Sequence, residues 1–257
     1  MRSNVKLKAI LLDLDNTLLS NSMETFMPAY LQAITRHVAH LIPPERLISE
    51  MMQATQAMNE NDGTGSTNEE AFASAFYPAL GYERAVLEPV FEQFYAKEFS
   101  KLQPLTQQRS EARPLVEWGF ERGLQVAIAT NPLFPRTAIE QRLEWAGIPV
   151  IEFDYALVTT YEDMHATKSH PAYYREILAQ LGRQPGECLM VGDHWEWDVA
   201  NAALAGIPAY WIAEPGETPP SLPPRKGDEM EVPVGQGGLA DLWDWVNAVH
   251  PRNPGRN

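Results

Sequence analysis

The stretch Ala9-Ile10-Leu11-Leu12-Asp13-Leu14-Asp15-Asn16-Thr17 determines how the rest of this sequence is interpreted. Its first four residues form an uninterrupted apolar run, which is typical of a short strand buried on both faces of a parallel sheet. Two acids, Asp13 and Asp15, then follow at once. Ligands of open parallel sheets bind beyond the carboxyl ends of the strands. Acids at this position therefore indicate a functional site, since core packing has no use for them.

Short apolar runs and helical segments alternate after Pro104. The predicted strands are residues 124–129, about 155–158, 188–191 and 209–212, and the predicted helices are 110–122, 135–146, 171–181 and 197–205. Glycine directly follows the predicted helices, as is common at helix C-termini. Repeating units of this length predict an α/β fold, a doubly wound, Rossmann-like parallel sheet with helices on both faces.

Residues 21–104 differ from the region after Pro104, because they show helical periodicity and contain no strand-like run. Phe26, Tyr30, Ile34 and Val38 recur at helical spacing. We therefore predict an inserted all-helical domain over residues 21–104 and an α/β core formed by residues 1–20 and 105–257. The many methionine and aromatic side chains of the insertion are interpreted as helical core rather than as a substrate pocket. A Pro- and Gly-rich tail from about residue 213 is expected to wrap loosely and to end in a helix that contains Leu239, Leu242, Trp243 and Val246.

Charge and cysteine content exclude several classes of partner. The 257 residues include 34 acidic and 20 basic side chains, for a formal net charge of −14. Non-specific nucleic-acid binding requires a basic surface, and anionic lipids repel an acidic one. No window approaches the roughly 18 apolar residues of a membrane span. Cys188 is the single cysteine, so no internal disulfide forms, and a cytoplasmic location is expected. The sequence indicates no oligomeric state.

Polar side chains follow the later strands as the acids follow the first one. They stand after strands or near the start of the next helix: Thr130, Asn131, Lys168, Asp193 and Asp198. Because the carboxyl ends of parallel strands meet at one edge of a sheet, we expect these groups to converge with Asp13 and Asp15.

This set of groups suits phosphoryl transfer. Asp13 is a candidate nucleophile that would form an aspartyl-phosphate. Asp15, two residues on, lies on the same side if the extended geometry persists, and would protonate the leaving oxygen and then activate water. Neighbouring carboxylates repel each other, and Mg²⁺ relieves this because it prefers oxygen ligands together with substrate phosphate. Lys168 and the Thr130 hydroxyl would neutralise charge on the phosphoryl oxygens.

The chain resembles the haloacid dehalogenase-like superfamily, chiefly its phosphatases, over about residues 8–212. Its motifs appear in order as Asp13-Leu14-Asp15-Asn16-Thr17, Ile128-Ala129-Thr130-Asn131, Lys168-Ser169-His170-Pro171, and Val191-Gly192-Asp193 with Asp198. In the third motif, Pro usually follows Lys directly, whereas Ser169 and His170 intervene here.

The resemblance implies roles for these residues. Asp13 would be the nucleophile and Asp15 the acid/base. Mg²⁺ would be held by Asp13, the backbone carbonyl of Asp15 and Asp193, with Asp198 as a ligand or a support behind the ligands. The phosphate would be held by Thr130, Asn131 and Lys168. The helical insertion would be the family's cap.

The expected function is Mg²⁺-dependent hydrolysis of a small phosphorylated metabolite. A phosphomutase uses the same motifs and remains an alternative. A haloacid dehalogenase would have no use for a metal or for Asp15 as a leaving-group acid. A non-catalytic binding protein of the same fold is a fourth interpretation, although such proteins typically lose Asp13, Asp15 or Lys168, and all three are present here.

Overall fold

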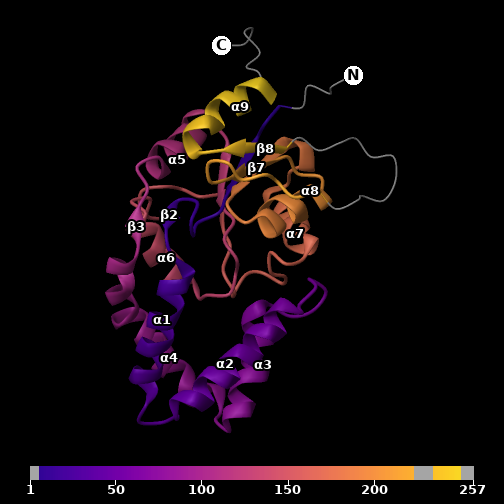
Figure 1. The fold of residues 1–257 in the computed structure, drawn as a ribbon. Helices are drawn as coiled ribbons and strands as arrows, with labels where there is room; N and C mark the ends of the chain where they lie inside the picture. The colour runs from indigo at the N-terminus through magenta and orange to yellow at the C-terminus, as the bar shows by residue number, and fades with distance from the viewer. Residues whose placement is uncertain (1–5, 223–233, 250–257) are drawn as a thin grey trace.

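The computed structural model describes residues 6–222 and 234–249, and its centre is a six-stranded parallel sheet (Figure 1). The strand order is β5-β4-β1-β6-β7-β8. The bounds are β1 (Ala9–Leu12), β4 (Gln125–Ile128), β5 (Leu157–Val158), β6 (Cys188–Gly192), β7 (Ala209–Ile212) and β8 (Val234–Gly237). Strand β1 pairs in parallel with both β4 and β6, and Leu12 lies level with Ile128 and Val191. The carboxyl ends of these three strands are therefore adjacent.

Alternate residues of β1 face two separate cores, which confirms the doubly wound α/β prediction. Ile10 and Leu12 pack in a cluster with residues of α5, α6 and α9, whereas Ala9 and Leu11 pack with residues of α7 and α8. Figure 1 shows α5 and α6 on the opposite side of the strands from α7 and α8. The bounds are α5 (Ala112–Glu121), α6 (Arg136–Trp145), α7 (Pro171–Leu181), α8 (Asn201–Leu204) and α9 (Leu242–Val249), and a π-helical turn (Trp195–Ala200) precedes α8.

A group of helices follows the first strand, as the sequence predicts. These helices, which we call the helical insertion, are α1 (Met23–Val38), α2 (Pro44–Asn59), α3 (Asn68–Leu80) and α4 (Arg84–Lys97), and a 3₁₀ segment (Phe99–Leu105) follows them. The chain leaves and re-enters the α/β part through an antiparallel pair of short strands, β2 (Leu19–Ser20) and β3 (Gln107–Gln108). The ring of Phe99 stacks on Trp145 of α6, with 5.4 Å between centroids. The insertion is thereby packed against the core at its base.

The C-terminal region differs in part from the prediction. The expected last helix is present as α9, and Leu239 lies in the 3₁₀ turn before it. The expectation of a loose tail is wrong for β8, which adds a parallel strand beside β7. A Cβ on Gly235 would lie 2.4 Å from the ring of Trp245, so the backbone approaches this helix closely. The sequence of β8, Val-Gly-Gln-Gly, lacks the apolar alternation by which strands are recognised. The rest of the predicted tail between β7 and β8 lies partly outside the described residues.

Among the helices of residues 6–222 and 234–249, none combines the length and apolar character needed to cross a bilayer.

Candidate active site

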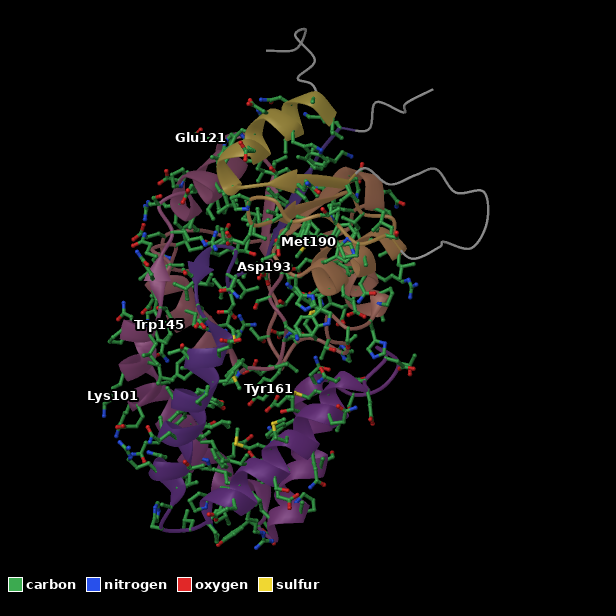
Figure 2. The ribbon with its side chains drawn as sticks, in the orientation of Figure 1. Lys101, Glu121, Trp145, Tyr161, Met190 and Asp193 are labelled. Carbon is green, nitrogen blue, oxygen red and sulfur yellow. The ribbon has the colours of Figure 1, made fainter. Side chains whose placement is uncertain are left out.

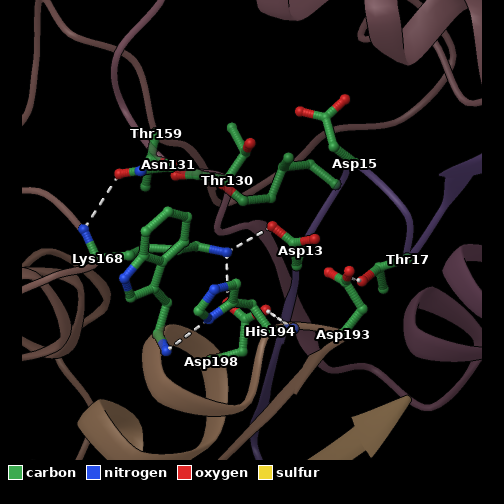
Figure 3. Close-up of polar contacts among 12 residues, drawn as sticks. Asp13, Asp15, Thr17, Thr130, Asn131, Thr159, Lys168, Asp193, His194 and Asp198 are labelled. Atoms are coloured by element: carbon green, nitrogen blue, oxygen red, sulfur yellow. Dashed lines mark hydrogen bonds and ion pairs between the residues drawn. The ribbon is translucent and has the colours of Figure 1, made fainter. Parts of the chain in front are cut away.

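The predicted polar side chains are brought to one edge of the sheet, where β1, β4 and β6 end (Figure 3). Backbone hydrogen bonds continue just past the strands: the amide of Asp13 donates to Val191 O at 2.9 Å and that of Ala129 donates to Leu12 O at 2.7 Å. These bonds place Asp13 between Thr130 and Asp193. The Thr130 carbonyl is itself fixed, because it accepts from the hydroxyls of Thr159 and Tyr173 at 2.7 and 2.8 Å.

Three carboxylates form a tight cluster at this edge. Asp13, Asp193 and Asp198 each offer an oxygen, and these oxygens all lie within 4.8 Å of one another. Asp13 and Asp198 are buried and Asp193 is half-buried. Thr17 donates its hydroxyl to Asp193 at 3.5 Å. Buried like charges at this separation are costly unless a cation lies among them.

Lys168 supplies one such cation. Its Nζ lies 2.5 Å from Asp13 Oδ1 and 2.6 Å from Asp198 Oδ1, and its side chain is only 2% exposed. Two amide side chains hold the backbone of this residue: Asn131 Oδ1 accepts from its N–H at 3.2 Å, and Asn201 Nδ2 donates to its carbonyl at 2.8 Å. The extra Ser169 and His170 therefore do not displace the lysine. In this structure Asn131 contacts the Lys168 backbone, a contact that the sequence did not indicate.

The electrostatics of the cluster follow from its burial. Burial raises the pKa of Asp13 well above its usual value; Lys168 opposes this increase, and Asp198 and Asp193 add to it. Burial, then the charge of Asp198, raises the pKa of Asp193 to about 6. Burial acts to lower the pKa of Lys168, but the adjacent Asp13 and Asp198 outweigh it and raise that pKa above its ordinary value. The two carboxylates therefore favour the charged form of Lys168 in the site.

Asp198 is placed by a close approach of its carboxylate to the backbone. A Cβ on Gly192 would lie 2.2 Å from Asp198 Oδ2, so only glycine leaves room for the carboxylate. The same oxygen accepts from the His194 N–H at 3.0 Å, while Oδ1 accepts from Lys168. Both oxygens of Asp198 thus have protein partners, and its position depends on the absence of a side chain at Gly192.

The Asp15 side chain lies apart from the other carboxylates and points away from Asp13 (Figure 3). Its Oδ2 is 2.5 Å from Arg142 Nη1, and its Oδ1 accepts from Asn21 Nδ2 at 3.0 Å. The chain turns after Leu14, whose carbonyl accepts from the N–H groups of Leu18 and Leu19 at 2.9 Å, and Asn16 within this turn has a left-handed φ of 60°. In this conformation the structure brings Asp15 to the edge of the site but does not place it beside Asp13.

Arg142 and Asn21 are the site residues that sequence reasoning missed. Arg142 is only 1% exposed and projects from the same face of α6 as the buried Ile139 and Leu143. Its guanidinium carbon lies 4.7 Å from the centre of the Phe134 ring. Its Nε and Nη2 have no hydrogen-bond partner among the residues that the structure describes. The sequence did contain a signal for Arg142, since it is a charged residue on the apolar face of a predicted helix.

The Arg142–Asp15 pair predicts an asymmetry in stability. Arg142→Met should lower the free energy of unfolding by only about 1–2 kcal/mol, because Asp15 keeps Asn21 and some solvent contact, and two buried nitrogen atoms without partners are removed. Asp15→Ala should cost about 3–5 kcal/mol, because it leaves a buried, unpaired guanidinium. Urea unfolding of both variants measures the difference. Equal losses, or a larger loss for Arg142→Met, would contradict this account of the pair.

Comparisons with known proteins show the family and the fold that this chain shares. A family model described as haloacid dehalogenase-like hydrolase matches residues 7–206. A phosphoserine phosphatase from Thermus thermophilus is 28% identical, and the alignment covers 88% of this chain and 98% of that protein. The solved structure of a phosphatase from Thermococcus onnurineus is similar with a TM-score of 0.55 at 21% identity, covering 93% of this chain and 98% of the other. A 2-haloacid dehalogenase from Pseudomonas syringae has a TM-score of 0.62 at 19% identity, covering 94% and 99%. At these identities the two structures establish a shared fold.

Proposed function

This chain belongs to the haloacid dehalogenase-like hydrolase family, and we propose that it is a Mg²⁺-dependent phosphatase that hydrolyses a small phosphate monoester. The observation that carries the proposal is the contact of Lys168 with both Asp13 and Asp198, beside Asp193. It combines a carboxylate nucleophile, a fixed cation and oxygen ligands for a metal. Alignment with a relative named as a phosphatase over 88% of the chain supports the same activity.

The donor set fits a hard divalent cation. Carboxylate oxygens are the ligands that Mg²⁺ prefers, and three of them lie within 4.8 Å of one another. Asp13, Asp193 and the backbone carbonyl of Asp15 would hold the ion, with Asp198 as a further ligand or as a support through Lys168. When bound, Mg²⁺ supplies positive charge that offsets the acids and the incoming phosphate.

Each residue of the site then has its own role in the proposed reaction. A carboxylate oxygen of Asp13 forms a bond to phosphorus while the bond from phosphorus to the leaving oxygen breaks. Lys168, the Thr130 hydroxyl and Asn131 stabilise the charge on the phosphoryl oxygens. Asp15, which pairs with Arg142 in this structure, would have to leave that partner to give a proton to the leaving oxygen. It then takes a proton from the water that attacks phosphorus, and this step frees Asp13 and inorganic phosphate.

Removal of the metal is the direct test of this function. We expect activity on a panel of phosphate monoesters to fall by more than about 100-fold with chelator and to return with Mg²⁺, because metal ions contribute several kcal/mol to phosphoryl transfer. The same panel separates a phosphomutase, which would isomerise the ester and release no inorganic phosphate. Full activity in excess chelator would refute the metal-dependent mechanism.

The raised pKa of Asp193 predicts a dependence of stability on pH. Between about pH 4 and pH 6, the folded protein retains a proton on Asp193 that the unfolded chain has lost. Without metal, this residue's contribution to the free energy of unfolding therefore decreases as the pH rises through that window. Mg²⁺ binds the ionised form, so stabilisation by Mg²⁺ should appear as the pH rises through about 6.

Denaturant unfolding of wild type and Asp193→Asn measures this contribution across the window, with and without Mg²⁺. The wild-type value minus the variant value should fall from pH 4 to pH 6 without metal. A rise over the same window, or stabilisation by Mg²⁺ that is equal at pH 4 and pH 7, would contradict the assignment.

We also propose how the chain divides into two domains and in which cellular compartment the protein works. Residues 21–104 would form the cap, and residues 1–20 and 105–257 the core. The single cysteine, Cys188, is buried in β6, which is compatible with a reducing, cytoplasmic compartment.

A further inference from the structure

A cavity of about 130 Å³ lies between the helical insertion and the α/β core. One part of its wall consists of apolar side chains from all four insertion helices: Met27, Ile34, Met51, Phe72, Phe76 and Phe91. The other part is Leu133–Pro135 and Tyr161, from loops of the core. Figure 2 labels Tyr161 on the side of the core that faces the insertion.

The core wall belongs to the carboxyl edge of the sheet. Leu133 is close in sequence to Thr130 and Asn131 at the end of β4, and its N–H donates to Asn131 O at 2.8 Å. Tyr161 follows the end of β5, and its N–H donates to Phe134 O at 3.3 Å. Phe134 also packs against Arg142, the partner of Asp15. The loop that carries the proposed phosphate-binding groups therefore continues directly into the wall of the cavity.

The charged groups of the wall already have partners. Arg84 donates its Nε to Glu88 at 2.6 Å and also pairs with Glu69. The hydroxyls of Tyr30 and Tyr95 are 2.8 Å apart and bond to each other. Two carboxylates and one guanidinium leave this part of the wall with one net negative charge. An entering carboxylate would lose its hydration and be repelled, and an entering ammonium group would compete with Arg84 for acids that are already paired. The lining therefore selects an uncharged group.

We propose that this cavity receives the organic group of the substrate, and that this group is uncharged, largely apolar and about the size of a six-membered ring. The inference rests on the proposed phosphatase function. An apolar cavity of about 150 Å³ is known to bind benzene, so the observed volume suits one ring or a short branched chain. The substrate class is an aryl or short alkyl phosphate, and a phosphorylated amino acid is disfavoured. The methionine and aromatic side chains of the insertion thus line a pocket as well as forming helical core.

Filling the cavity tests the inference. Ala73 lines it from α3, and Ala71 lies on the same helix outside the lining, which makes Ala71→Leu a matched control. Ala73→Leu should lower kcat/KM for phenyl phosphate by about tenfold or more, because one methylene group more or less in an apolar pocket changes kcat/KM by about 10-fold or more. It should change kcat/KM for methyl phosphate by less than about twofold. The control should leave both values within that range.

A second variant tests the inference independently in case Ala73→Leu does not fold. Met51→Ala enlarges the cavity and should raise the ratio of kcat/KM for 1-naphthyl phosphate over phenyl phosphate by about fivefold. Equal effects of Ala73→Leu on phenyl and methyl phosphate, or a wild-type preference for charged esters such as phosphoserine, would overturn the inference and leave the phosphatase function intact. If wild type with Mg²⁺ releases no phosphate from any ester, the proposed function itself fails.

Discussion

Asp13→Asn should abolish hydrolysis of p-nitrophenyl phosphate, with kcat reduced by at least about 10³-fold, while the protein remains folded. An amide has nearly the shape of the carboxylate but cannot form the bond to phosphorus. The fold should tolerate the change, because burial disfavours the charged form of Asp13 and Lys168 keeps its contact with Asp198. Initial rates and the melting temperature measure the two effects.

A variant at a neighbouring acid provides the control for Asp13→Asn. Asp193→Asn removes a carboxylate from the same cluster without removing the nucleophile, so its activity should recover in part at high Mg²⁺ concentration. Asp13→Asn should not recover under these conditions. An Asp13→Asn protein that keeps more than about a tenth of wild-type activity would exclude Asp13 as the nucleophile.

Lys168→Met should cause a comparable loss of activity and a large loss of stability. It leaves Asp13 and Asp198 buried without their shared cation. Breaking a buried pair from one side typically costs about 3–5 kcal/mol. Guanidinium unfolding at pH 7 measures this loss. Lys101→Met, which breaks an exposed pair with Glu98, is the matched control and should cost less than about 1 kcal/mol.

A double variant shows whether Lys168→Met lowers stability through electrostatics or through lost packing. The double variant Asp13→Asn/Lys168→Met removes one of the stranded acids, so it should be more stable than Lys168→Met alone. Mg²⁺ should also stabilise Lys168→Met more than wild type, because it replaces the missing positive charge. If the double variant is less stable than either single variant, the effect is loss of packing and the electrostatic account is wrong.

The sequence was sufficient to predict the features that depend on local pattern. The apolar run before Asp13 and the runs before Thr130 and Asp193 predict parallel strands, and the structure aligns their ends. Helical periodicity correctly predicts an insertion after the first strand. The placement of Lys168 at the acid edge followed from the same topology, although its contacts with two carboxylates at once required coordinates.

Features that depend on long-range packing could not be predicted in this way. Arg142 is 127 residues from Asp15, and no local pattern links them. Arg142 and Asn21 hold the Asp15 carboxylate away from Asp13, whereas the two-residue spacing alone suggests that both acids share a side. Strand β8 is held by backbone pairing with β7, and its glycines allow neighbouring side chains to approach closely. Hydrophobic periodicity therefore misses it.

The central claim is that Asp13 carries the phosphoryl group. The most direct test is mass spectrometry of Asp15→Asn after acid quench from a reaction with p-nitrophenyl phosphate and Mg²⁺. Nitrophenolate leaves without a proton, so Asp13 should still be phosphorylated, whereas the water that completes the reaction lacks its base. We expect a phosphoryl group on the peptide that contains Asp13, formed with the stoichiometry of a burst of nitrophenolate. A burst with no phosphoryl group on Asp13, or with the group on another residue, would contradict the mechanism.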